Sequence, residues 1–440
     1  MNLETILLEA DDCCSFKNQE GHGEAIQYFI SKKNNLNIFS FGKKTKEDDE
    51  QIAYFNYRDA KWYAGRFIGE AVFEFNNLKY KIIIHPRFGN TQLFRMLEEV
   101  YNIRLPQSNN NLEKQTEYKY LIKKIISFLW LNLLSKANKH GIPKNNSIKI
   151  QKGATIIGKF DIRKSILPIY TEEKIISKFH EKTPNKTITS ILKNAHRILK
   201  AEYHLTNEMI SMSSKNAIEQ IYTSKIDNRF ISENDYTKIQ YRDIYLSYKP
   251  IVDLSWDIIK KKNFSNSEDN NKQGLSFFID VAEIWEMYLR SILKRRFLKD
   301  GWIIRNDKIS TYKDKDFSRT LIPDIVLEKG NDVMVWDAKY KRMEFVYFDY
   351  DRADFFQIHT YITYFKQSKN VVAGGLLYPL SKEFDSYRQL RNKANSLYAE
   401  EKNNIQFVVD GIDYSNLTDE KIKYEEVNFL DRISAIINNK

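Results

Sequence analysis

Two aspartates in the C-terminal third of the chain lie in neighbouring β-rich runs. Runs 321–328 and 333–340 carry Asp324 and Asp337, and the polar loop 329–332 between them contains a glycine. This pattern is typical of a β-hairpin. A symmetric hairpin closed by this loop places Asp324 directly opposite Asp337. Directly opposed like charges are destabilising, so the pair indicates a divalent cation bound between them.

Lys339 lies two residues after Asp337, and alternation along a strand turns both side chains to the same face. The two charges interrupt an otherwise apolar strand. Burying them without use costs roughly several kcal/mol each. The alternative, in which Asp324 is a turn residue and Asp337 a strand-edge charge, explains each residue alone but not the set. The three residues together predict a catalytic site.

A helix predicted over residues 280–297 offers a third acid. Its apolar residues recur at helical spacing and form one arc. Glu286 lies at the edge of this arc, where it can reach a cleft beside the core. Glu283 lies near the centre of the solvent face. We therefore expect Glu286 to serve the site, with Glu283 as the alternative.

A second helix, predicted over residues 349–365, presents three polar side chains on one face. Asp354, Gln357 and Tyr361 are spaced at i, i+3 and i+7. We expect them to support the site. The alternative is an ordinary amphipathic helix with Tyr361 in the core.

Pro323-Asp324 followed by Asp337-Ala338-Lys339 resembles the PD-(D/E)xK nuclease signature. The resemblance implies an α/β (α+β) fold, with a restriction-endonuclease-like mixed sheet flanked by helices. It also implies hydrolysis of phosphodiester bonds in duplex DNA. In this scheme Lys339 orients the attacking water or stabilises charge on the phosphorus.

The same resemblance implies a bound Mg²⁺, for which Mn²⁺ substitutes. The implied ligands are Asp324, Asp337, the carbonyl of Ala338 and Glu286. On the downstream helix, Gln357 and Tyr361 resemble the Gln-x-x-x-Tyr element of RecB-like nucleases, which implies that they position the DNA backbone or Lys339.

Several segments resemble the McrC family, the nuclease subunits of modification-dependent restriction systems. They are residues 63–65, 82–87, 155–162, 274–286 and 354–361, with Lys159 where the family usually has arginine. The resemblance implies a McrB-like AAA+ GTPase hexamer as partner, modified double-stranded DNA as substrate, and an antiviral role. GTP would enter only through the partner, and residues 1–110 would dock it.

Polar breaks at 107–111 and 263–274 divide the chain into three predicted domains. Residues 1–110 form a β-rich module, in which we expect residues 20–105 to form antiparallel strands. Residues 111–262 form a mainly helical domain with a strand pair within 147–166, and helices are expected over 171–216. Residues 263–440 form the nuclease domain.

The net charge of +11 favours polyanionic partners. No apolar run approaches the roughly 20 residues needed to span a bilayer. Two adjacent cysteines and an acidic start without a signal pattern lead us to expect a cytoplasmic protein. The run 153–160 nearly matches a phosphate-binding loop, but Phe160 stands where a hydroxyl would bind Mg²⁺, so we do not expect nucleotide binding.

Two alternatives remain open from the sequence. One is a RecB-like repair or recombination nuclease that works without a GTPase. The other is a catalytically inactive DNA-binding scaffold with a nuclease-like fold.

Overall fold

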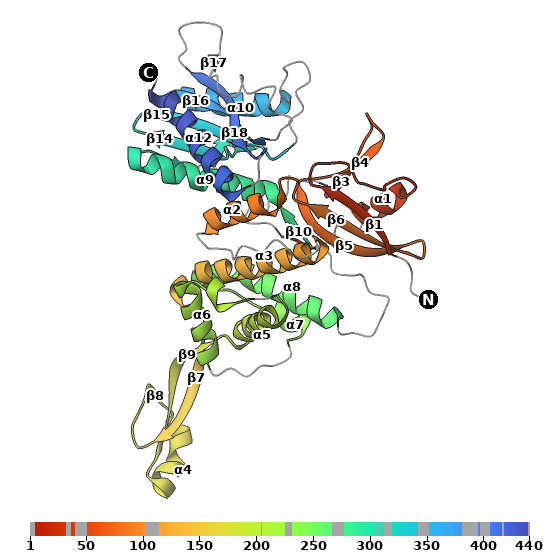
Figure 1. The fold of residues 1–440 in the computed structure, drawn as a ribbon. Coiled ribbons are helices and arrows are strands. Elements are labelled where there is room, and N and C mark those ends of the chain that lie inside the picture. Colours follow the sequence, from red (N-terminus) through yellow and green to blue (C-terminus); the bar gives the residue numbers. More distant parts are fainter. Residues whose placement is uncertain are drawn as a thin grey trace. The chain divides into compact units, whose positions relative to one another are not determined.

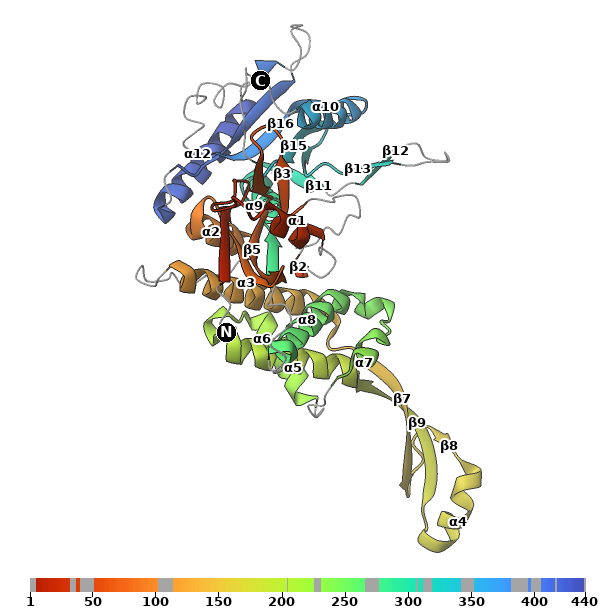
Figure 2. The ribbon, with the colours of Figure 1, turned by 90° about the vertical axis from the view of Figure 1, so that its right-hand side faces the viewer.

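The structure is a computed structural model. It describes residues 5–31, 37–39, 51–101, 114–203, 205–224, 231–265, 277–305, 308–311, 319–341, 352–380, 395–396, 405–415 and 418–438. The chain forms two compact units (Figures 1 and 2). Residues 1–105 and 273–440 form the first unit, and residues 106–272 form the second. The sequence-based division at 110 and 262 differs from this grouping, because the first and last segments pack together as one unit.

The N-terminal part of the first unit is built on a mixed sheet with strand order β1-β6-β5-β10-β2. Its strands are β1 (Thr5–Asp11), β2 (Asn37–Phe39), β5 (Phe67–Phe75), β6 (Leu78–His85) and β10 (Phe277–Asp280). A separate hairpin is formed by β3 (Ala53–Asn56) and β4 (Lys61–Ala64). Helices α1 (Gly23–Ser31) and α2 (Gly89–Tyr101) complete the module.

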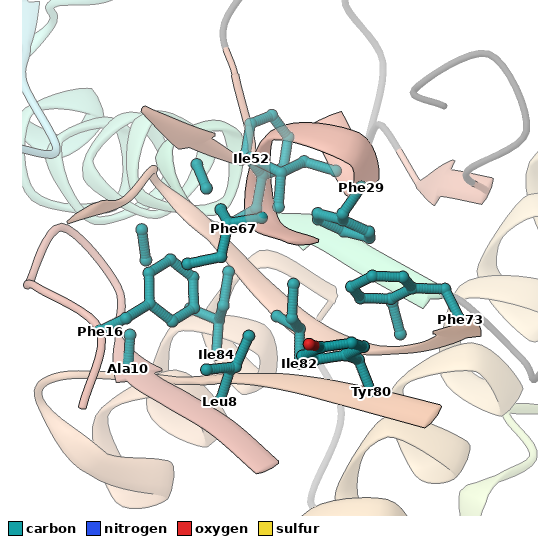
Figure 3. Packing of buried hydrophobic residues seen from close by; sticks show 14 of the residues in the cluster. Leu8, Ala10, Phe16, Phe29, Ile52, Phe67, Phe73, Tyr80, Ile82 and Ile84 are labelled. Carbon is teal, nitrogen blue, oxygen red and sulfur yellow. The ribbon is translucent and has the colours of Figure 1, made fainter. Parts of the chain in front are cut away.

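The β5–β6 hairpin turns at Asn76 and Asn77, as the sequence predicts. Both residues have positive φ angles, 49° and 60°, which asparagine tolerates better than most residues. The strand pairs within residues 20–105, β3–β4 and β5–β6, are antiparallel as predicted, whereas β1 lies before that range and runs parallel to β6. Leu8, Phe73 and Ile82 belong to the core that this sheet buries (Figure 3).

Strand β10 connects the N-terminal sheet to the C-terminal part of the first unit. It pairs antiparallel with β5, and the Arg66 carbonyl accepts a hydrogen bond from Val281 N at the start of the next helix. Arg66 also lies 2.9 Å from Asp280, whose carboxylate caps that helix. A local sequence pattern does not reveal this long-range pairing, so the predicted boundary at 263 separated segments that share a sheet.

The C-terminal part of the first unit has a second mixed sheet, with strand order β11-β14-β15-β16-β18-β17. Its strands are β11 (Ile303–Arg305), β14 (Ile325–Lys329), β15 (Asp332–Ala338), β16 (Asn370–Leu380), β17 (Asn395–Ser396) and β18 (Gln406–Asp413). A small hairpin is formed by β12 (Ile309–Thr311) and β13 (Arg319–Leu321). β14 and β15 are antiparallel, whereas β15, β16 and β18 run parallel.

Helices cover both faces of this sheet. They are α9 (Val281–Phe297), α10 (Arg352–Lys366) and α12 (Asp419–Asn438). Helix α10 packs on the face of the sheet to which Val333 and Val335 of β15 point. Met334 and Trp336 alternate to the other face and are also fully buried. The mixed α/β architecture that the sequence predicts is therefore present, whereas α12 was not predicted.

The second unit is a helical bundle with a long β-arm. Its helices are α3 (Lys114–Ala137), α5 (Lys186–Glu202), α6 (Met212–Thr223), α7 (Glu233–Thr237) and α8 (Lys249–Ser265). The arm contains β7 (Lys144–Gly153), β8 (Lys159–Phe160), α4 (Ile162–Glu172) and β9 (Ile175–Pro184). Both views show β7 and β9 extending away from the bundle, with α4 at their far end (Figures 1 and 2).

Two predictions for this unit were wrong. The strand paired with β7 is β9, not a strand within 147–166, and residues 162–172 are helical. Residues 175–184 are therefore a strand rather than part of a helix. The run 153–160 extends from the last residue of β7 through β8. Asp161 caps α4 by accepting a hydrogen bond from Lys164 N, which gives this part of the 155–162 segment a structural role.

Candidate active site

The β14–β15 hairpin sets the register of the two predicted aspartates. Ile325 pairs with Trp336, so Asp324 lies one step beyond the ladder, opposite Asp337. Asp324 Oδ2 accepts a hydrogen bond of 2.9 Å from Ala338 N. The predicted register is confirmed. The turn is tighter than expected, because strand pairing continues to the ends of the predicted loop and Gly330 turns the chain with a φ of 60°.

Asp337 is fully buried, and its two oxygens have different surroundings. Oδ2 lies 2.6 Å from Lys339 Nζ. Oδ1 accepts no hydrogen bond within the described part of the chain. Burial, and then the charge of Asp324, raise the pKa of Asp337 to about 8. A buried carboxylate oxygen without a donor, beside a second carboxylate, fits the oxygen ligand set that Mg²⁺ prefers.

Lys339 lies at the centre of the polar contacts. Besides Asp337, its ammonium lies 3.4 Å from Asp354 Oδ1 and donates a hydrogen bond of 2.8 Å to Gln357 Oε1. Burial acts to lower the pKa of Lys339, but the charges of Asp337 and Asp354 outweigh burial and raise it. The side chain is therefore held as a cation in one position.

Helix α10 brings together the three polar residues predicted on its face. Gln357 Nε2 donates to the Tyr361 hydroxyl over 2.9 Å, and that hydroxyl lies 3.3 Å from the Ile322 carbonyl to which it donates. Tyr361 also packs in the apolar core under the helix, so it has both roles that the sequence left open. Burial raises its pKa, which keeps the hydroxyl protonated. The chain of contacts therefore runs from the core to Lys339.

Asp354 has partners that the sequence did not predict. It is buried, and Lys341 Nζ lies 2.5 Å from its Oδ2. The Tyr378 hydroxyl donates to the same oxygen over 3.3 Å. Lys341 continues the alternation of Asp337 and Lys339 along the chain, and this spacing could have revealed it. Tyr378 comes from the neighbouring strand β16, which no local pattern connects to the hairpin.

Glu286 and Glu283 are both half-buried, so Glu283 does not face open solvent as expected. Arg290 lies one turn after Glu286. Burial lowers the pKa of Arg290, and the negative charges of Glu286 and Asp324 act to raise it. Within the described residues, no three acidic, histidine or cysteine side chains converge closely enough to hold a metal ion. The structure thus brings Asp324, Asp337 and Lys339 together, and Arg290 lies near both Glu286 and Asp324.

Comparison with known proteins identifies the family of the chain. The sequence matches the family described as "McrBC 5-methylcytosine restriction system component" over residues 64–379. The chain belongs to this family. The matched range extends from the N-terminal sheet to strand β16 and includes every candidate site residue. No curated protein matches the chain.

Solved structures of McrBC assemblies resemble the chain only distantly. One is a half-complex from a tetradecameric assembly of Thermococcus gammatolerans McrB AAA+ hexamers with bound McrC; the match has 15% identity and a TM-score of 0.49, and covers 98% of this chain and 100% of that chain. Another is the Thermococcus gammatolerans McrBC complex, with 14% identity, a TM-score of 0.31, and coverage of 67% and 88%. Among the described residues, no helix is long and apolar enough to cross a bilayer.

Proposed function

We propose that the chain is the nuclease subunit of a McrBC restriction system, with a PD-(D/E)xK catalytic centre on the β14–β15 hairpin. The observation that carries the proposal is the grouping of Asp324, Asp337 and Lys339 on one face of adjacent strands. The buried Asp337, whose Oδ1 accepts no hydrogen bond from the described residues, lies beside the half-buried Asp324, and this pair fits a metal site better than a packing role.

Mg²⁺ would be held by Asp324, Asp337 and the Ala338 carbonyl, with Glu286 as a further candidate. When bound, it polarises the scissile phosphate and lowers the pKa of a bound water. Mn²⁺ would substitute. The reaction forms a bond from water oxygen to phosphorus and breaks one P–O bond of the DNA backbone.

Lys339 acts as a fixed positive charge in this scheme. Because its pKa is raised, it stays protonated and is a poor general base. It therefore stabilises negative charge that develops on the phosphate, or donates a hydrogen bond that orients the attacking water. Gln357 and Asp354 hold its ammonium in place, and Tyr361 in turn holds Gln357.

We propose that the substrate is modified duplex DNA and that a McrB-like AAA+ GTPase hexamer is the partner. The family match supports this proposal. The arm of the second unit is a better candidate for docking than residues 1–110. It exposes a row of apolar side chains, and such surfaces are typical of protein interfaces. They are Ile148, Ile150, Ile156, Ile157, Ile162, Ile166, Leu167, Ile169 and Tyr170.

The test is cleavage of methylated and unmethylated plasmid by the purified chain, with and without the partner, GTP and Mg²⁺. We expect cutting of methylated DNA only when all components are present. Cutting by the chain alone with Mg²⁺ would favour the RecB-like alternative. A lack of cutting under every partner condition, despite DNA binding, would favour the inactive scaffold.

A further inference from the structure

Directly after Lys339, the chain enters a buried polar cluster that the N-terminal module supplies. The ring of Tyr340 is buried, and the guanidinium carbon of Arg87 lies 4.8 Å from its centre. Asp12 is fully buried; its Oδ1 accepts a hydrogen bond of 2.6 Å from Arg87 N, and its Oδ2 lies 3.6 Å from Arg87 Nε. The cluster thus joins the ends of β1, β6 and β15.

The nuclease chemistry makes no use of this cluster, and packing does not account for its charges. Buried ion pairs contribute little net stability, because desolvation offsets their attraction. Burial raises the pKa of Asp12, and a hydrogen bond from the Tyr340 hydroxyl is among the contacts that act to lower it. Arg87 Nε and Nη2 are also buried without a hydrogen-bond partner among the described residues. Such incompletely satisfied groups in a native interior call for a functional explanation.

A second set of contacts connects the same cluster to Lys339 from the other side. The Leu377 carbonyl accepts hydrogen bonds from Lys339 N, over 2.9 Å, and from Trp285 Nε1, over 3.3 Å. The Trp285 ring contacts the Tyr414 ring, with centroids 6.2 Å apart, and the Tyr414 ring contacts Phe88, with centroids 5.4 Å apart.

Phe88 connects these contacts back to Tyr340. The Phe88 ring packs edge-on against the Tyr340 ring, with centroids 6.5 Å apart, and the Arg87 guanidinium carbon lies 4.8 Å from the centre of the Phe88 ring. The backbone on either side of Lys339 is therefore held by one continuous set of contacts. That set includes residues from the segment after β6, the α9 helix, strand β16 and the segment after β18.

We propose that Asp12, Arg87 and Tyr340 are positioning residues that fix the backbone of Lys339, so that the N-terminal module is part of the support of the nuclease site. The consequence for cleavage rests on the proposed function. Contacts at Asp337 and Gln357 hold the tip of the Lys339 side chain, whereas the cluster holds its backbone. A displacement of about 1 Å at a catalytic group can lower a rate about a hundredfold.

The test compares Tyr340→Phe and Arg87→Lys with a matched control, Tyr248→Phe. Tyr340→Phe removes the hydroxyl that hydrogen-bonds to Asp12, and Arg87→Lys keeps the charge but removes the planar group that stacks on Tyr340. Tyr248 is also fully buried, and its hydroxyl donates to Asn138 Oδ1 over 2.6 Å. Tyr248 belongs to the second unit, so the control removes a buried hydroxyl from outside this set of contacts.

The first measurement is amide hydrogen exchange of residues 333–341 in the full chain, without metal or DNA. We expect exchange at least about fivefold faster in both test variants than in the unaltered chain, because their local opening costs less. We expect the control to match the unaltered chain in this segment. In the reconstituted complex, kcat should fall about tenfold in the test variants while KM for DNA stays unchanged.

Unchanged exchange at 337–341 in Tyr340→Phe overturns the proposal, even if cleavage falls. An equal increase in Tyr248→Phe also overturns it, because the effect would then be general loosening. If the unaltered chain does not cleave DNA under any condition, the proposed function fails, and the exchange comparison still decides whether the cluster fixes Lys339.

Discussion

Lys339 is the residue on which most contacts of the candidate site converge. Carboxylates from β15 and α10 and an amide from α10 surround one ammonium. The sequence predicted Asp324, Asp337 and Lys339 because alternation along two short strands fixes their facing directions. It did not predict Arg290 near Asp324 or Tyr378 beside Asp354, because those contacts depend on how separate elements pack.

Replacing Gln357 tests how Lys339 is held. Gln357→Met keeps the volume but removes the acceptor for the ammonium. A hydrogen bond to a charged group contributes about 1.5–3 kcal/mol, so we expect the cleavage rate to fall about ten- to a hundredfold. Thr360→Ala, on the exposed face of the same helix, is the control and should keep the full rate. Single-turnover kinetics measure both; equal rates for Gln357→Met and Thr360→Ala would contradict the role of Gln357.

The raised pKa of Asp337 predicts a pH dependence of stability in the metal-free chain. Because its folded pKa, about 8, lies above its unfolded value, the folded state holds the proton more tightly. This stabilisation is complete below the unfolded pKa and is lost as pH rises towards 8. We expect Tm to fall between about pH 4 and 8, and the fall to be smaller in Asp337→Asn. Identical slopes in thermal unfolding would argue against a buried, proton-holding Asp337.

Metal binding should reverse the fall in Tm expected at high pH. With Mg²⁺ on the ionised carboxylates, as proposed, the folded chain would gain stability by mass action, and the gain should be larger at pH 8 than at pH 6. The measurement is Tm with Mg²⁺ and after its removal by chelation, for the unaltered chain and Asp337→Asn. A Tm increase of the same size in both proteins would place the metal elsewhere.

Among the helices and strands, the periodicity of apolar residues predicted the β14–β15 hairpin and helices α9 and α10. The wrong predictions concern strands whose pairing partners lie elsewhere in the chain. Residues 175–184 lie in a segment predicted to be mainly helical, yet a ten-residue ladder with β7 makes them strand β9. β10 belongs to a sheet whose other strands lie far away in sequence. Pairing partners of this kind are absent from any local window.

Gly375 tests the close packing of the parallel strands next to the site. A Cβ at this position would lie 1.7 Å from the Val408 carbonyl oxygen, so Gly375→Ala must separate β16 from β18. We expect the free energy of unfolding of the first unit to fall by at least about 2 kcal/mol. Gly153→Ala, where a Cβ would meet only the end of the Gln151 side chain, at 3.6 Å, is the control. If denaturant unfolding gave equal midpoints for Gly375→Ala and Gly153→Ala, β16 and β18 would be able to separate at little energetic cost.

For the whole molecule, the two compact units suggest a division of roles. The first unit combines the proposed nuclease site with the N-terminal module, and the second carries the arm with its exposed apolar residues. The three-domain division from the sequence relied on polar breaks, which mark loops but do not reveal which segments pack together.

Charges on the arm should separate assembly from catalysis. Ile150→Asp and Leu167→Asp alter side chains that are 56% and 72% exposed, so the fold should tolerate them. We expect partner binding to weaken at least about tenfold, since each change removes apolar contact area and introduces a charge into the interface. Sedimentation with the GTPase partner measures assembly, and Mg²⁺ binding to the free chain should be unchanged. Normal assembly of both variants would exclude the arm as the docking surface.

The central claim is that one hairpin carries the cleavage chemistry. The most direct measurement is single-turnover cleavage of methylated duplex DNA by the complex reconstituted with Asp337→Ala, Lys339→Ala, or Asp332→Asn as a control from the same strand. We predict that the first two variants assemble with the partner but do not cut, whereas Asp332→Asn cuts at the full rate. Mg²⁺-dependent cutting by a purified Asp337→Ala, Lys339→Ala double variant would contradict the account.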